Sequence, residues 1–279
     1  MNLIRRCKPL LGTYVEMQLA GDMSDDDLLD LSIAAFSEIE KVERLMSFHC
    51  SDSELSYVNR MAYQRPCAIS AEMTQVLQRA LYLSEISDGL FDVSIAPVLI
   101  HSGLLPDHGV ATDSSAGWRD ILLQGGMLSF NRQMQLDLGG IAKGFAVDQA
   151  IAVLPDGIRA MVNAGGDLRM THWQDQEVAI RIPRQQSQAI ELPMQAAAVA
   201  TSACYYLDEK DAAASAIVLP ASQCPINDER SFSVFAADAM LADALTKIVF
   251  LAPERAALLK QLDAFAVMVD EQGCVQQLQ

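Results

Sequence analysis

Residues 137–148 read Asp-Leu-Gly-Gly-Ile-Ala-Lys-Gly-Phe-Ala-Val-Asp, a glycine pair followed by an apolar-periodic segment with a lysine near its start. Because Gly139 and Gly140 carry no Cβ, the backbone there can approach a ligand closely. A helix beginning at this point would offer free N–H groups to a phosphate, with Lys143 in its first turn. The stretch therefore predicts either an anion site or a plain tight turn. Its spacing is neither a Rossmann fingerprint nor a Walker loop.

Composition indicates a packed globular protein. The 279 residues are 51% hydrophobic and 20% charged, and no run of about 18 apolar residues could span a bilayer. No break in composition forces a division, so we expect a single domain over residues 1–279. The net charge of −16 and the absence of a Lys/Arg cluster argue against a nucleic-acid partner.

Cysteine usage and the N-terminus carry weaker signals. The six cysteines form no Cys-x-x-Cys pair and only four histidines are present, so a zinc site has little support and we expect buried or inert thiols. The first residues are basic but lack the apolar segment of a secretory signal. We therefore expect either a cytoplasmic protein or one whose leader is missing from this sequence.

Hydrophobic periodicity predicts elements of mixed order. Alternation over 13–19 predicts a strand, Ser24 caps a predicted helix with the acidic run 25–27 in its first turn, and Ser70 caps a second helix. Further strands are predicted near 127–138, 158–163, 177–182, 215–219, 231–236 and 264–269, and helices over 141–154 and 239–250. Strands with one polar face favour antiparallel sheets, and the order does not match βαβ repeats. The sequence predicts an α+β fold.

Seven short motifs follow one another in a diagnostic order. They are Leu11-Gly12-Thr13, Asp52-Ser53-Glu54-Leu55, Asp88-Gly89-Leu90-Phe91-Asp92, residues 137–148, Asn163-Ala164-Gly165-Gly166-Asp167, Ala200-Thr201-Ser202 and Ala242-Asp243-Ala244-Leu245. In this order the chain resembles the FAD:protein FMN transferases, the ApbE-like family, over roughly residues 10–251. The resemblance implies a single large α+β domain of ApbE-like fold, with mostly antiparallel sheets flanked by helices.

The resemblance also implies an activity and its partners. Family members bind FAD and a magnesium ion, and transfer FMN through a phosphoester bond to a Ser or Thr hydroxyl of an acceptor protein. Some instead hydrolyse FAD to FMN and AMP. The implied acceptor is a flavoprotein of an electron-transfer system. Many relatives are periplasmic or membrane-associated, so localisation is left open between these and the cytoplasm.

Individual residues receive roles from the same resemblance. FAD would lie against Leu11, Leu90, Phe91, Asp92, Asp137, Lys143 and Ile217. His49 falls where relatives carry an aromatic side chain that packs on the flavin nucleotide, and an imidazole can stack there too. The implied metal ligands are the main-chain oxygen of Gly140, Asp243 and Thr246, and the implied catalytic residues are Asp243, Thr246 and Lys247.

The late helix departs from the family pattern. Relatives carry a Thr four residues after the metal-binding Asp, where a hydroxyl shares one helix face with the carboxylate. Here Lys247 occupies that position and Thr246 is displaced to i+3. Either Lys247 supplies part of the metal's charge and pairs with Asp243 or the FAD diphosphate, or Asp243 and Thr246 still hold magnesium. A third interpretation is an ordinary surface Asp–Lys pair.

A second departure affects the segment that relatives write His-x-x-Asp-Pro-x-Thr-Gly. It aligns with residues 216–223, Ala-Ile-Val-Leu-Pro-Ala-Ser-Gln, which keep only the Pro and a hydroxyl. Loss of a proton-transferring His could lower the rate about 10²–10⁴-fold. The family's Thr-Ser-Gly is likewise Thr-Ser-Ala at 201–203, where a positive φ would be disfavoured. Besides transfer, the alternatives are an impaired FAD-binding homologue, an FAD pyrophosphohydrolase, and a docking protein with an empty site.

Overall fold

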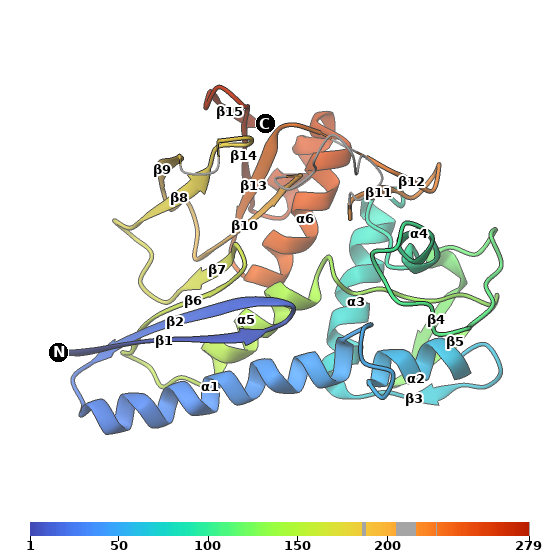
Figure 1. Cartoon of the computed structure of the whole chain (residues 1–279), viewed down its shortest axis with the longest axis horizontal. Helices are drawn as coiled ribbons and strands as arrows, with labels where there is room; N and C mark the ends of the chain where they lie inside the picture. Colours follow the sequence, from blue (N-terminus) through green and yellow to red (C-terminus); the bar gives the residue numbers. More distant parts are fainter. Residues whose placement is uncertain (186–187, 205–215, 227, 279) are drawn as a thin grey trace. The chain divides into compact units, whose positions relative to one another are not determined.

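The computed structural model describes residues 1–185, 188–204, 216–226 and 228–278 (Figure 1). The chain divides into two compact units. We call Met1–Glu43, Ile141–Tyr205 and Asp228–Gln279 the sheet unit, and Arg44–Gly140 with Tyr206–Asn227 the helical unit. Each is described by itself.

The sheet unit contains an eight-stranded sheet in which every neighbouring pair is antiparallel. Its strands, in spatial order, are β1 (Asn2–Leu10), β2 (Thr13–Gly21), β6 (Arg159–Ala164), β7 (Asp167–Met170), β10 (Ala198–Ala203), β13 (Ser231–Ala236), β14 (Phe265–Val269) and β15 (Val275–Leu278). A separate hairpin pairs β8 (Glu177–Arg181) with β9 (Ala189–Pro193). The helices are α1 (Asp25–Met46), α5 (Ala142–Ala152), α6 (Ala239–Leu251), the short 3₁₀ helix η2 (Pro253–Ala256) and α7 (Ala257–Gln261).

The centre of this sheet is covered on both faces. Helices α5 and α6 contact each other and pack on β6, β7, β10 and β13, and the rings of Phe232 and Phe250 lie 5.1 Å apart there. On the other face, Val199 and Phe235 belong to an apolar cluster that Val178 of β8 also contacts. Every residue of β13 is therefore buried, which a strand covered on both faces requires.

Helix α1 runs beside the edge strand β1 (Figure 1). Its N-cap is Ser24, whose Oγ accepts the Asp27 N–H at 3.1 Å, as the sequence predicts. Lys8 of β1 reaches across to Glu40 at 2.9 Å, and its ammonium lies 4.9 Å from the ring centroid of Phe36. These contacts hold α1 along the outer strand of the sheet.

Close approach of α5 and α6 depends on Gly144. A Cβ on this residue would lie 2.1 Å from the main-chain oxygen of Ala239. The carboxylate of Asp148, one turn later on α5, accepts the N–H groups of Ala239 and Met240 at 2.9 Å each. It thereby satisfies two of the donors that the start of α6 leaves open. The two helices therefore contact each other closely at Gly144 and are hydrogen-bonded through the Asp148 side chain.

The helical unit consists of short elements around its own core. They are α2 (Glu54–Met61), β3 (Cys67–Ala68), α3 (Ala71–Ile86), α4 (Ala96–His101), the 3₁₀ helix η1 (Trp118–Asp120), β4 (Ile121–Gln124), β5 (Met127–Phe130), β11 (Val218–Leu219) and β12 (Cys224–Pro225). Strands β3, β5 and β4 form one antiparallel sheet, and β11 pairs with β12. Ser70 caps α3 by accepting the Met73 N–H at 3.2 Å, which confirms the predicted cap.

The α+β class and mostly antiparallel sheets are confirmed, and two local predictions need correction. The strand predicted near 127–138 ends at Phe130. Beyond it the main chain of Leu136 is bound on both sides by the Asn59 amide, at 2.8 and 2.9 Å, so a side chain replaces the strand partner. Of the predicted strand 215–219 only Val218–Leu219 pairs, and residue 215 lies outside the described residues.

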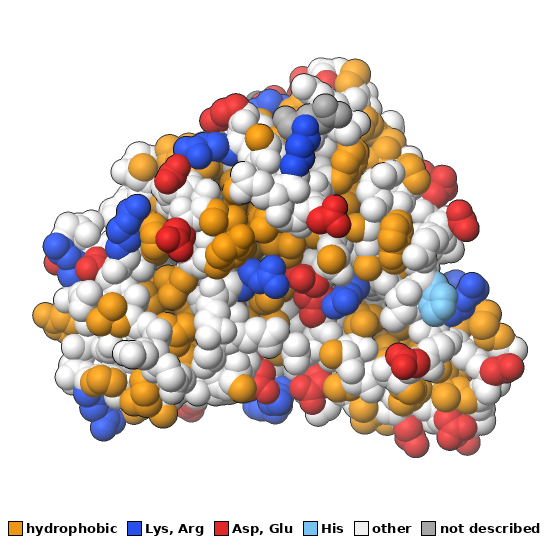
Figure 2. All heavy atoms as spheres, turned by 180° about the vertical axis from the view of Figure 1, so that it is seen from behind, with side chains coloured by type: hydrophobic (Ala, Val, Ile, Leu, Met, Phe, Trp, Pro, Cys, Tyr) orange, Lys and Arg blue, Asp and Glu red, His pale blue; other side chains and the backbone are white. Residues whose placement is uncertain are grey.

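Helix hydrophobicity, cysteine exposure and surface charge can also be compared with the predictions. None of the described helices is long and apolar enough to cross a membrane. Of the six cysteines, Cys67 is buried, Cys204 is half-buried and the other four are exposed, so burial is confirmed for Cys67. On the face shown in Figure 2, Lys and Arg side chains are scattered among Asp and Glu side chains.

We expect Gly144→Ala to destabilise the protein by about 3 kcal/mol or more, because the added methyl meets backbone atoms of α6 that cannot move without separating the helices. Urea unfolding followed by circular dichroism measures the loss. Gly117→Ala is the control: its Cβ would meet nothing closer than 4.0 Å, and its φ of −154° suits any residue. Equal stability of the two variants would contradict the prediction.

Candidate functional site

Two hairpin turns of the sheet unit meet at their tips. Leu11 and Gly12 join β1 to β2 with φ of 57° and 69°, as a type I′ turn requires. Gly165 and Gly166, also at positive φ, join β6 to β7. A Cβ on Gly165 would lie 2.7 Å from Oγ1 of Thr13. The structure thus brings together two motifs that lie about 150 residues apart in the sequence.

Four charged side chains of alternating sign contact one another in a row that begins at Asp167, directly after the Gly165–Gly166 turn. Lys143, the second residue of α5, places Nζ 2.8 Å from Oδ2 of Asp167 and 3.5 Å from Oδ2 of Asp243. Asp243, in the middle of α6, is fully buried and accepts the Gly144 N–H at 3.2 Å. Lys247 contacts its other carboxylate oxygen. We call Asp167, Lys143, Asp243 and Lys247 the four-charge chain.

Opposite electrostatic effects act on these groups. Burial would raise the pKa of Asp243, but the ammonium groups of Lys143 and Lys247 outweigh it and hold that pKa below its usual range. Burial and the Asp243 charge raise the pKa of Asp167. Burial would lower the pKa of Lys143, but Asp167 and Asp243 hold it above its usual range. Lys143 therefore stays protonated at neutral pH, and the formal charges of the chain sum to zero.

The hydroxyl of Thr246 is directed away from the Asp243 carboxylate. Its Oγ1 donates to the main-chain oxygen of Asp243 at 2.7 Å and lies 2.6 Å from Oγ of Ser202 on β10. Thr246 therefore ties α6 to the sheet. Ala203, next along β10, is paired with Ser231 in regular extended backbone, so the Gly-to-Ala departure meets no positive φ here.

Magnesium, which the resemblance implies, prefers several oxygen ligands that remain free to bind it. At Asp243 both carboxylate oxygens already accept N–H donors, and two of those donors are cationic. The Thr246 hydroxyl is engaged elsewhere. Gly140, whose main-chain oxygen the resemblance implies as a ligand, lies in the turn before α5. Among the described residues, no three His, Cys, Asp or Glu side chains are grouped as a metal site. The residues present do not fit a divalent cation.

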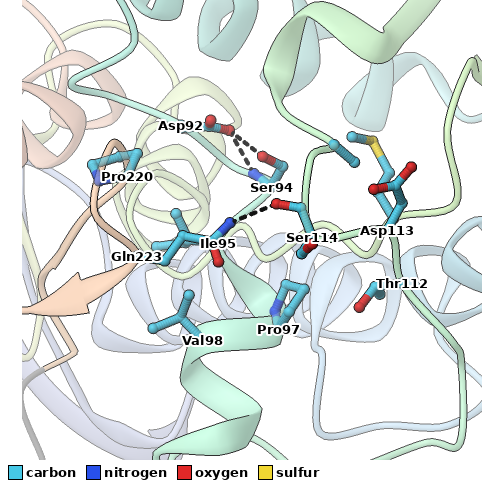
Figure 3. A pocket seen from close by; sticks show the side chains of 12 residues that line it. Asp92, Ser94, Ile95, Pro97, Val98, Thr112, Asp113, Ser114, Pro220 and Gln223 are labelled. Atoms are coloured by element: carbon cyan, nitrogen blue, oxygen red, sulfur yellow. Dashed lines mark hydrogen bonds between the residues drawn. The ribbon is translucent and has the colours of Figure 1, made fainter.

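The helical unit holds a pocket that joins two sequence motifs (Figure 3). Asp92 and Ser94 line it from one segment, and Pro220 and Gln223 line it from the segment that departs from the family pattern. Ser94 donates its N–H and Oγ–H to Asp92 at 2.8 and 2.7 Å. Burial raises the pKa of Asp92 in spite of these bonds. The other lining residues are Ile95, Pro97, Val98, Thr112, Asp113, Ser114, Ala116 and Met134.

The remaining predicted residues differ in exposure. In the helical unit His49 is exposed, Leu90 and Asp137 are half-buried, and Phe91 and Ile217 are buried. Asp137 accepts the Gly139 N–H at 3.1 Å.

In the sheet unit Leu11 is half-buried, and its N–H donates to Glu43 at 2.7 Å. The sequence analysis assigned no role to Asp167, although this residue directly follows the glycine pair Gly165–Gly166. The position of that acidic residue was the available signal.

The fold and site define an α+β protein whose antiparallel sheet carries a buried, charge-balanced lysine–aspartate cluster. The chain matches the ApbE family over residues 11–269, and it belongs to that family. Relatives named FAD:protein FMN transferase include one from Vibrio cholerae, 27% identical over 94% of this chain and 85% of its own, and one from Klebsiella pneumoniae, 27% identical over 93% and 87%.

Solved structures agree with this assignment. A variant of the flavin transferase ApbE from Vibrio cholerae is 25% identical, with a TM-score of 0.83 over 99% of this chain and 97% of its own. An ApbE protein from Thermotoga maritima, 20% identical, has a TM-score of 0.83 over 99% and 97%, and it bears on the fold alone. The ApbE-like fold is therefore confirmed.

We expect Asp243→Asn to cost about 3–5 kcal/mol of unfolding free energy, because it leaves the ammonium groups of Lys143 and Lys247 beside a neutral group. Adding Lys247→Met to this variant should recover part of the loss, since it removes one uncompensated cation. Chemical denaturation of the wild type, both single variants and the double variant measures the coupling. Additive losses would contradict a coupled pair.

Asp92 predicts a pH dependence of stability. Its folded pKa lies above the unfolded value of about 3.9, so between these values the folded state binds more protons and stability falls as pH rises. Asp92→Asn lacks this titration, so the wild type should lose stability relative to the variant as the pH rises above about 4. Urea midpoints of both proteins over this range test the sign. A wild type that gains on the variant with rising pH would refute it.

Proposed function

We propose that this protein binds FAD and transfers its FMN moiety, through a phosphoester bond, to a Ser or Thr hydroxyl of an acceptor protein. The observation that carries the proposal is the ApbE family match over residues 11–269. Relatives named FAD:protein FMN transferase align with more than nine-tenths of the chain, which supports an activity of the whole fold rather than of a fragment.

In the sheet unit, the proposed FAD contacts are Leu11 and Lys143. The glycines of the two tight turns, Gly12 and Gly165–Gly166, support this role, because backbone without a side chain allows a nucleotide to approach closely. Lys143 stays protonated and is 30% exposed on its side chain. It can therefore present positive charge to a diphosphate while keeping its bonds to Asp167 and Asp243.

In the helical unit, the proposed FAD contacts are His49, Leu90, Phe91, Asp92, Asp137 and Ile217. The pocket at Asp92 supports this part of the proposal, because it is concave and combines apolar walls with a few polar groups. Phe91 and Ile217 are buried, so they fix the conformation of the two segments, around Asp92 and around Pro220, that line the pocket. Exposed His49 offers an imidazole face for stacking.

The proposed reaction exchanges one P–O bond for another. The acceptor hydroxyl oxygen bonds to the flavin-side phosphorus of FAD, and the bond from that phosphorus to the bridging oxygen breaks. AMP leaves with the bridging oxygen, and the hydroxyl proton is released. Negative charge grows on the bridging and non-bridging oxygens during this step, and fixed positive groups lower its energy. Lys143 is one such group.

The acceptor is proposed to be a flavoprotein of an electron-transfer system. FAD is the substrate in this proposal. Magnesium enters only through the family resemblance, and the donor set at Asp243 does not support it.

Hydrolysis of FAD to FMN and AMP is a second candidate, because water can replace the acceptor hydroxyl at the same phosphorus. A flavin-binding homologue without turnover is a third. The loss of the His and Asp from residues 216–223 favours it, since this segment borders the Asp92 pocket through Pro220 and Gln223.

Incubation with FAD and a family-type acceptor domain separates the three. We expect AMP by chromatography and covalent flavin on the acceptor by in-gel fluorescence. Lys143→Met should lower AMP release about 10²–10³-fold, the usual effect of removing one group that stabilises transition-state charge. Lys260→Met, which changes an exposed lysine of α7, is the matched control. Free FMN with AMP would indicate hydrolysis, and bound FAD without AMP would refute both reactions.

A further inference from the structure

Lys247 belongs to the buried site rather than to the surface of α6. It stands one turn after Asp243, and its ammonium group turns back to contact Oδ1 of that residue and to donate to its main-chain oxygen at 3.0 Å. The side chain of Lys247 is 22% exposed and that of Asp243 is fully buried. This geometry excludes an ordinary surface pair, because both interactions end on a group that water does not reach.

The charges leave no place for a divalent cation at Asp243. Two carboxylates and two ammonium groups already balance, and both ammonium groups contact the Asp243 carboxylate. A cation bound to that carboxylate would lie within a few ångströms of both, where like charges repel strongly in a poorly solvated site. It would also have to displace Lys247 from Oδ1.

We infer that the Lys247 ammonium takes the place of a divalent metal ion at Asp243, so that this protein handles the FAD diphosphate without a metal bound at that residue. The inference deepens the proposed function and rests on it for the identity of the ligand. A lysine ammonium is a compact charge with three donors that suits phosphate oxygens. Held by Asp243 and its own helix, Lys247 is a fixed cation that chelators cannot remove.

Direct metal binding gives the first test. Mn²⁺ is titrated into the wild type, Lys247→Thr and the surface control Lys260→Thr, with free Mn²⁺ read by electron paramagnetic resonance. Threonine at 247 removes the ammonium and puts a hydroxyl on the same helix face as Asp243. We expect the wild type and the control to leave Mn²⁺ free. Lys247→Thr should bind one Mn²⁺ about 10–100-fold more tightly, the range by which a neighbouring group changes metal affinity.

One Mn²⁺ bound by the wild type and lost in Asp243→Asn would overturn the inference. This wild-type measurement stands even where Lys247→Thr does not fold, which circular dichroism shows.

The second test is AMP release from FAD with EDTA or with Mg²⁺. We expect the wild type to be insensitive to both, and Lys247→Thr to lose about 10²-fold or more in EDTA and to recover with Mg²⁺. Abolition of wild-type activity by EDTA would overturn the inference. If FAD binds and no AMP forms under any condition, the proposed transfer fails, and the Mn²⁺ titration alone then decides the role of Lys247.

Discussion

The contact of α5 with α6 at Gly144 is the constraint on which the sheet unit depends. Because this residue has no side chain, the two helix backbones touch, and its N–H reaches Asp243 in the middle of α6. One turn further, Asp148 supplies acceptors for the first N–H groups of α6 and also bonds Arg169 of β7 at 2.7 Å. The same contact that packs the helices on the sheet therefore places a carboxylate where water does not reach. The contact at Gly144 therefore determines both the helix packing and the position of Asp243 in the site.

A carboxylate in that position needs compensation, and the four-charge chain supplies it locally. Breaking a buried pair is costly, while the intact pair adds little net stability because desolvation offsets attraction. The four-charge chain is therefore better explained by the positions in which it holds its two lysines than by a contribution to folding stability. It keeps one lysine between Asp167 and Asp243 and a second lysine on the far side of Asp243. The carboxylates of Asp167 and Asp243 hold the pKa of Lys143 above its usual range, so this lysine stays protonated at neutral pH.

Much of this could be predicted from the sequence, for identifiable reasons. Helices with strong periodicity and Ser caps at 24 and 70 came out as expected, since capping and amphipathicity are local properties. The end of β5 at Phe130 could not be predicted, because the amide of Asn59, distant in sequence, takes the place of a strand partner. At the site, Asp243 and Lys247 stand four residues apart on one helix, and this spacing predicts their pairing as one interpretation. Asp167 was missed because its partner Lys143 comes from another element, and no local pattern links them.

The two departures from the family pattern both affect how well negative charge is stabilised in the transition state of the proposed reaction. A metal ion would approach phosphate oxygens at about 2.0–2.1 Å with two charges, whereas an ammonium hydrogen-bonds at about 2.7–2.9 Å with one. Pro220 and Gln223 of the segment 216–223 line the same pocket as Asp92, and this segment has no His or Asp to move a proton. On the proposed function, both changes reduce the stabilisation of charge that grows only in the transition state, while the turns and the pocket that recognise the nucleotide are kept. When an interaction is made only in the transition state, its loss lowers the turnover rate and leaves substrate binding in the ground state unchanged. On the proposed function, we therefore expect this chain to bind FAD and to cleave it slowly, with the Lys247 ammonium as a fixed charge.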